Sequence, residues 1–94
     1  MKLLMFVFDA ALEDIILQEF QTMGIEGWTK IPKAYGKGHR SDPLLDTHIW
    51  PGYHVLYVVK VDDPEPLKPK LRELSEKYKH RGFRVFILPL EDFI

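Results

Sequence analysis

The side chains best suited to chemistry gather in residues 36–52, GKGHRSDPLLDTHIWPG. Glycines flank Lys37, and a flexible backbone beside cations can hold an anion, because amides and cationic groups both donate to its oxygens. The segment contains no GxxxxGK[ST] phosphate loop, and the alternative is a basic loop that is simply solvated. Aromatic rings in and beside the segment could stack on a base. The candidate effector-binding residues are Lys33, Lys37, Arg40, Trp50 and Tyr53.

The same segment offers donors for a divalent metal ion. Imidazole and carboxylate groups at His39, Asp42, Asp46 and His48 suit zinc, copper or nickel. Their spacing matches no established ligand signature. In the metal-binding alternative, the ligands are His39, Asp46 and His48.

Catalysis is not expected. Ser41 is one of only two serines, and it lies too close in sequence to His39 and Asp42 to resemble a triad. The acidic pairs at 13–14 and 91–92 fit a helix start and a terminal tail better than an acid/base pair. We therefore predict a protein with no catalytic residues.

Composition narrows the function classes further. The chain has 94 residues, a formal net charge of -1, and 46% hydrophobic residues, which indicates one globular domain over 1–94. A general nucleic-acid binder would need a basic surplus. The absence of cysteine removes disulfides and Cys-based metal sites. No apolar run reaches membrane-spanning length, so we expect a cytoplasmic protein without membrane insertion.

The amide residues suggest a source organism. Asparagine is absent and only two glutamines occur. Thermophile proteins tend to lose these thermolabile side chains. The sequence therefore favours a thermophilic origin.

Apolar spacing predicts the elements that position the segment 36–52. Residues 2–8, 53–61 and 83–90 form apolar runs typical of strands, and 25–35 is extended, with Pro32 indicating an edge or a bend. A helix capped by Asp9 ends at Gly24, and a second begins near 66–68 and ends at Gly82. The predicted apolar stripe of the first helix is Leu12, Ile15, Ile16, Phe20 and Met23. That of the second is Leu67, Leu71, Leu74 and Tyr78.

The order β-α-β-β-α-β predicts an α+β, ferredoxin-like sandwich, with both helices on one face of a four-stranded antiparallel sheet. The strands are apolar on both faces, so the face without helices would expose a large apolar patch. We place Leu4, Leu56, Val58 and Leu88 on that open face, which argues against an RNA-binding sheet. We expect the face to mediate self-association; the alternative is that the loop or the tail covers it.

Two stretches, GWTKIPKAYGKG and THIWPGYHVLYVVKV, resemble the P-II-like superfamily of trimeric signalling proteins. The first is similar to the strand that leads into the family's protruding loop, and the second to the return strand. The resemblance implies a homotrimer whose inter-subunit clefts bind small effectors, often adenine nucleotides. It also implies that the loop contacts a target protein. Trp50 and Gly52 resemble the CutA-like branch, for which divalent metal binding is proposed.

The resemblance and the residues together predict a cytoplasmic homotrimer that senses a small anion or nucleotide in an inter-subunit cleft. The effector would order the loop 36–52, which would signal to a target protein. The alternative is a CutA-like metal-binding trimer.

Overall fold

Strands and helices alternate along the chain in the predicted order. The computed structural model describes residues 1–94. Its main elements are β1 (Lys2–Asp9), α1 (Glu13–Thr22), β2 (Thr29–Ala34), β3 (His54–Val61), α2 (Lys68–Lys77) and β4 (Arg84–Pro89). Short 3-10 turns precede each helix, at Ala10–Leu12 and Glu65–Leu67, and a third, η3 (Lys79–Arg81), follows α2. No helix of the chain combines the length and the apolar character of a membrane span.

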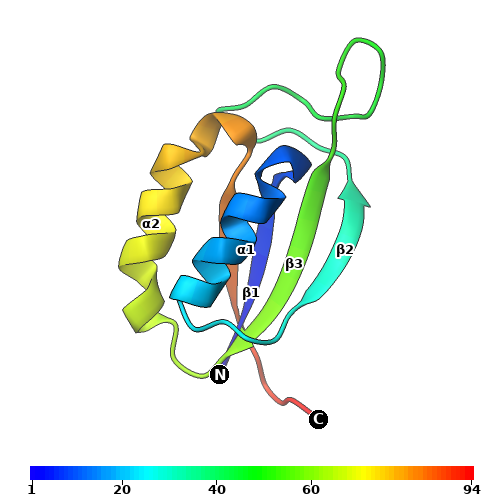
Figure 1. Cartoon of the computed structure of the whole chain (residues 1–94). Coiled ribbons are helices and arrows are strands. Elements are labelled where there is room, and N and C mark those ends of the chain that lie inside the picture. Colours follow the sequence, from blue (N-terminus) through cyan, green and yellow to red (C-terminus); the bar gives the residue numbers. More distant parts are fainter.

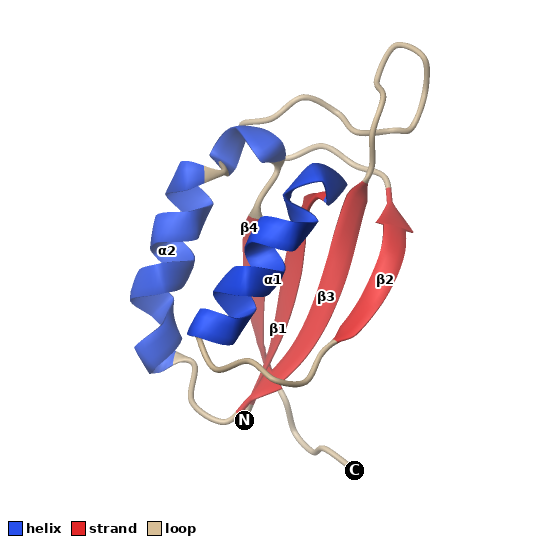
Figure 2. Ribbon diagram, viewed as in Figure 1, coloured by secondary structure: helices blue, strands red, loops and turns tan.

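The sheet has the strand order β2-β3-β1-β4, and every neighbouring pair is antiparallel. Figure 1 shows both helices on the same face of this sheet. Figure 2, coloured by element type, shows the resulting two layers. This arrangement confirms the predicted ferredoxin-like fold.

The core lies between the two layers. On β1, Leu4, Phe6 and Phe8 alternate inward and are fully buried. Register places Phe6 opposite Tyr57, so the inward sets of β1 and β3 share one face. Phe6 meets Phe20 of α1 edge-on, with ring centroids 4.7 Å apart. Leu4 therefore belongs to the core, and its predicted place on the open face is wrong.

Local signals explain where the helices begin and end. The Asp9 carboxylate accepts a hydrogen bond of 2.9 Å from the Ala11 amide, as an N-cap should. Past α1, Gly24 adopts a φ of +75°, which glycine reaches without steric cost. Ile15 was predicted to be buried but is 44% exposed, while Ile16 next to it is fully buried. Adjacent helical residues point about 100° apart, and only one of the two can face the sheet.

The edge strand β2 is shorter than the predicted extended segment. It begins at Thr29, and its pairing with β3 shifts register between Ile31 and Ala34, the interval that contains Pro32. Proline has no amide hydrogen to donate, so it fits an edge strand at an irregularity. The position predicted for Pro32 is confirmed.

The sheet face away from the helices carries exposed apolar side chains. Phe86 is 50% exposed, Ile31 45% and Leu88 40%. The C-terminal tail covers only one corner, where the Phe93 ring lies 5.4 Å from the Lys60 Nζ. Most of the face is left open, as the strand pattern predicts.

Candidate functional site

The loop between β2 and β3 crosses the sandwich before it protrudes. It leaves β2, runs to the C-terminal end of α2, and returns to form a projecting tip (Figure 1). The outgoing and returning segments are joined by two backbone hydrogen bonds between Gly36 and Leu44, of 3.0 and 2.8 Å. The Gly38 amide donates to the Ser41 hydroxyl at 3.2 Å, which closes the turn. The base of the loop is therefore a defined structure, and the loop is not simply a solvated coil.

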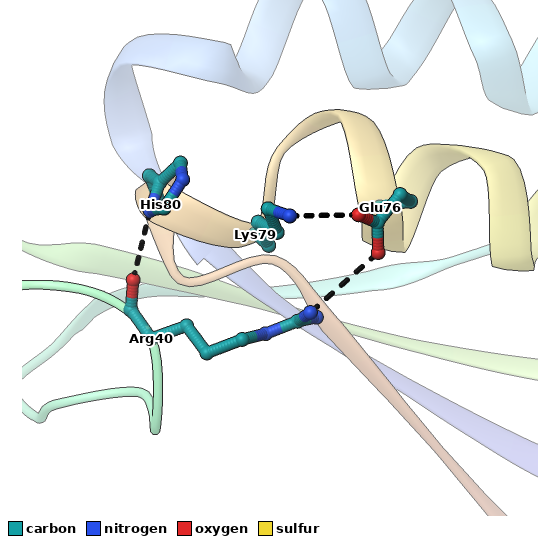
Figure 3. Close-up of polar contacts among 4 residues, drawn as sticks. All are labelled: Arg40, Glu76, Lys79 and His80. Carbon is teal, nitrogen blue, oxygen red and sulfur yellow. Dashed lines mark hydrogen bonds and ion pairs between the residues drawn. The ribbon is translucent and has the colours of Figure 1, made fainter.

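Polar contacts fasten this turn to the end of α2 (Figure 3). The Arg40 carbonyl oxygen lies 3.1 Å from Nδ1 of His80, which donates when that nitrogen is protonated. The Arg40 guanidinium reaches Glu76 at 3.5 Å, and Lys79 binds the other Glu76 oxygen at 2.7 Å. This hydrogen bond and the charge of Lys79 lower the pKa of Glu76. The guanidinium contact is exposed and long, so it leaves Arg40 free to meet another anion.

A hollow of about 290 Å³ lies between the turn and the end of α2. Its lining contains no hydrophobic residue. The lining residues are Lys37, His39, Arg40, Ser41, Asp42 and His80. Cations and hydrogen-bond donors dominate this set, which suits a hydrated oxyanion.

Arg84, the first residue of β4, points its charge toward the base of the loop. It is half-buried, and its Nη1 donates to the Gly82 carbonyl oxygen at 2.9 Å. No carboxylate lies within ion-pair distance of it, whereas most other cations near the loop have one. Burial lowers the pKa of the Arg84 guanidinium, which still stays charged at neutral pH. A half-buried cation without a counter-charge is unfavourable, and a bound anion would stabilise it.

Three glycines bring the backbone close to Arg84. A Cβ placed on Gly36, Gly38 or Gly82 would lie 3.9, 3.3 or 3.5 Å from one of its guanidinium nitrogens. The contact at Gly38 is tight, and Gly82 also needs to be glycine because of its φ of +71° and its contact with His54. The same absence of side chains would let an anion's oxygens reach backbone amides.

His54, the first residue of β3, lies beneath this cluster. It is 1% exposed, and its Nε2 is buried without a hydrogen-bond partner. Burial lowers the pKa of His54, and the charge of Arg84 lowers it further, against an opposing effect of Asp9. The imidazole is therefore neutral at pH 7.

The five predicted effector residues fall in three places. Lys37 and Arg40 meet at the polar hollow. Lys33 and Tyr53 lie together beneath the tip: the Lys33 Nζ binds Asp46 at 3.0 Å and lies 4.9 Å from the centre of the Tyr53 ring. Trp50 is on the tip itself, 39% exposed, with its backbone amide bound to the Thr47 hydroxyl at 3.0 Å.

The predicted metal ligands are not brought together within one subunit. Asp46 contacts Lys33, and His39 borders the hollow. The chain contains no group of three or more His, Cys, Asp or Glu side chains placed to hold a metal ion.

Two residues of this site, Arg84 and His54, were missed in the sequence. Arg84 is the only charged residue in the strand RVFILP, and His54 opens the strand HVLYVVKV, whose one other charged or ionisable basic residue is Lys60. A lone cation in an apolar run is a signal that could have singled out Arg84. His80, in the turn that follows α2, also contacts the loop through the Arg40 carbonyl oxygen.

Similarity to known proteins identifies the family of the chain. The family model described as "Nitrogen regulatory protein P-II" matches residues 1–94. No curated protein matches the chain. Among solved structures, it resembles CPII, a nitrogen regulatory PII-like protein from Thiomonas intermedia K12 bound to ADP, AMP and bicarbonate. The TM-score is 0.66 at 18% identity, over 93% of this chain and 88% of that one.

A second similar structure is a putative PII-like signaling protein from Thermus thermophilus. The TM-score is 0.59 at 21% identity, over 92% of this chain and 82% of that one. At these identities the two structures show the fold alone, whereas the family model covers the whole sequence. The chain belongs to the nitrogen regulatory protein P-II family.

Proposed function

We propose that this protein is a regulator, not an enzyme, and that it binds a small anionic effector at the base of the β2–β3 loop. The observation that carries the proposal is the half-buried guanidinium of Arg84, which has no carboxylate partner. An uncompensated charge away from water costs free energy, and a bound anion would offset that cost. Lys37 and Arg40 at the neighbouring hollow would add further charge.

The effector we propose is an adenine nucleotide or bicarbonate. CPII, which shares the fold, is described as bound to ADP, AMP and bicarbonate. In this chain, the backbones of Gly36, Gly38 and Gly82 lie close to the Arg84 guanidinium, so that backbone amides and Arg84 would together donate to phosphate or carboxylate oxygens. Lys33 near the end of β2, Trp50 on the tip and Tyr53 just before β3 would line the rest of a cleft completed by a neighbouring subunit.

The proposed assembly is a homotrimer formed through the open sheet face. The exposed side chains of Ile31, Phe86 and Leu88 support it, because apolar patches of this kind normally mark interfaces. The cytoplasmic location and the thermophilic origin stay predictions from the sequence.

The loop would transmit the signal. An anion at the hollow competes with Glu76 for Arg40, and the exposed Arg40–Glu76 contact is a weak competitor because water screens it. Binding would therefore shift how the turn is held on α2, and with it the tip. Ile49 on the tip is 76% exposed, which suits contact with a target protein. The metal-binding alternative has no comparable support, since no donor group is assembled in the chain.

Calorimetry with ADP and with bicarbonate tests the proposal. Arg84→Gln should weaken binding by tenfold or more, an effect of the size expected for a charge-assisted hydrogen bond to an anion, about 1.5 to 3 kcal/mol. The double variant Lys37→Ala, Arg40→Ala should also weaken it. Arg72→Gln, at an exposed α2 arginine without an ion pair, is the matched control and should bind normally. Absence of binding by the unaltered protein, or equal binding by Arg84→Gln, would contradict the proposal.

A further inference from the structure

His54 is enclosed on every side that the structure defines. Its backbone pairs with Asp9 of β1 and with Ala34 of β2. A Cβ on Gly82 would lie 2.6 Å from its Nε2, and one on Gly36 would lie 3.9 Å from its Nδ1. Water does not reach Nε2, and no protein group hydrogen-bonds to it. Buried polar atoms nearly always have a hydrogen-bond partner, so the unpaired Nε2 at the base of the loop needs an explanation other than packing.

The charges that act on His54 come from two elements: the Arg84 cation on β4 and the Asp9 carboxylate at the end of β1. The Asp9 carboxylate is paired with Arg81 of η3, whose Nε donates to its Oδ2 at 2.9 Å, and it still raises the pKa of His54 against the larger effect of Arg84. β2 and the loop base present only Ala34 and Gly36, which carry no charge. Of these two charges, only that of Arg84 has no ion-pair partner.

We infer that an anion bound at Arg84 is taken up together with a proton on His54, so that the effector site also responds to pH. This inference rests on the anion site proposed above. In the empty site, an imidazolium would be a second buried cation beside Arg84, so His54 stays neutral. A bound anion cancels the charge of Arg84 and favours the protonated imidazole. By linkage, protonation of His54 then favours the anion to the same extent.

The pH window follows from the direction of each change. The pKa of His54 in the empty protein lies below its ordinary value of 6.5. Anion binding raises it, and between the two values each anion brings up to one proton. Affinity should therefore increase as the pH falls through this window, by at most about tenfold per pH unit. Above the window, affinity should not depend on His54.

Nuclear magnetic resonance and calorimetry test the inference on the full-length protein with ADP as the probe. The imidazole signals of all four histidines are titrated with and without saturating ADP, because His39 and His80 border the hollow. The expected result is a His54 pKa that rises on binding. Calorimetry in two buffers of different ionisation enthalpy should show proton uptake that His54→Gln abolishes. Comparing that variant with the unaltered protein removes the proton uptake of ADP itself.

The outcomes separate this inference from the proposed function. ADP binding with an unchanged His54 pKa overturns the inference and leaves the anion site standing. Failure of ADP to bind at any pH, together with failure of bicarbonate to bind in the calorimetry above, overturns both. A second arm needs neither ligand nor a change at His54: Arg84→Gln should raise the pKa of His54 in the empty protein. An unchanged pKa there overturns the inference, even where His54→Gln does not fold.

Discussion

Gly82 packs directly against the imidazole of His54, with no space between them for a side chain. A Cβ at position 82 would lie 2.6 Å from Nε2 and 3.3 Å from Cδ2 of His54. Gly82 also has a φ of +71°, where side chains other than glycine are strained. The turn that ends η3 and the buried base of β3 are thus fitted to each other, although 28 positions separate the residues in sequence.

Gly82→Ala should therefore lower the free energy of unfolding by about 3 kcal/mol, the sum of left-handed backbone strain and overpacking. Gly24→Ala is the matched control, since Gly24 has a φ of +75° and nothing within 4 Å of its would-be Cβ. It should cost only about 1 to 2 kcal/mol, from backbone strain alone. Urea unfolding measures both variants. Equal losses would show that the contact with His54 carries no cost.

Stability should fall on mild acidification because His54 is buried in its neutral form. Its pKa is lowered by burial and by Arg84, so the unfolded chain binds the proton first as the pH falls. The contribution of neutral His54 to the free energy of unfolding is therefore complete above pH 6.5. It decreases as the pH falls toward the pKa of His54 in the folded protein. His54→Gln should flatten this dependence. Urea unfolding between about pH 5 and 8 measures it, below the range where lysines titrate and above that of most carboxylates. A gain in stability on acidification would contradict the burial of neutral His54.

A second buried polar contact joins the sheet to α1. Tyr57, 1% exposed, donates its hydroxyl to Glu13 at 2.5 Å, and Glu13 also binds Lys30 at 2.7 Å. Burial and the Glu13 carboxylate raise the pKa of Tyr57. Burial of Glu13 opposes its ionisation, but the hydrogen bonds from Lys30 and Tyr57 and the Lys30 charge outweigh this and lower its pKa.

Tyr57→Phe should cost about 2 kcal/mol at pH 7, as expected for a hydrogen bond to a charged group. The loss should shrink at acidic pH, since the lowered pKa of Glu13 gives stability that is present above 4.5 and disappears as the pH falls through the folded value. Tyr35→Phe, at a tyrosine that is 58% exposed, should change stability by less than about 0.5 kcal/mol. Chemical unfolding at about pH 7 and about pH 3.5 compares them, on either side of the ordinary glutamate pKa. If Tyr57→Phe lowers stability as much at the lower pH as at the higher one, the effect comes from packing and not from the hydrogen bond to charged Glu13.

Local sequence signals were enough to predict the elements of the fold. Apolar runs predicted the strands, Asp9 capped the chain's first helical turn, and Gly82 ended the second helical segment. Each of these signals depends on residues within a few positions of one another in the sequence. Two placements were wrong. Ile15 and Ile16 both fitted a stripe that only one of them could enter, and Leu4 was assigned to the open face because the strand is apolar on both faces.

The candidate site could be predicted only in part. Lys37 and Arg40 share a loop, and their proximity follows from the sequence. The meeting of His54, Gly82 and Arg84 does not, because it depends on the order of the strands and on the path of the loop over α2. Contacts set by topology leave no local pattern in the sequence. The metal hypothesis had the same weakness: donors close in sequence were not brought together.

The open sheet face gives the last prediction. Register sets Phe86 of β4 opposite Met5 of β1, beside Leu88 and away from the helices. Replacing Phe86 by aspartate would place a charge in the middle of an apolar contact surface, where its desolvation is unfavourable. If three copies pack through this face, the unaltered protein should have three times the monomer mass of 11.1 kDa, and Phe86→Asp should run as a monomer or precipitate.

Ile15→Asp provides the control for this experiment. Ile15 is also apolar and 44% exposed, but it lies on α1, on the other side of the molecule from the open face. Its variant should keep the mass of the unaltered protein in native mass spectrometry. A Phe86→Asp protein that stays soluble at an unchanged mass would show that the subunits meet elsewhere. A monomeric unaltered protein would show that the open face is not the interface proposed here.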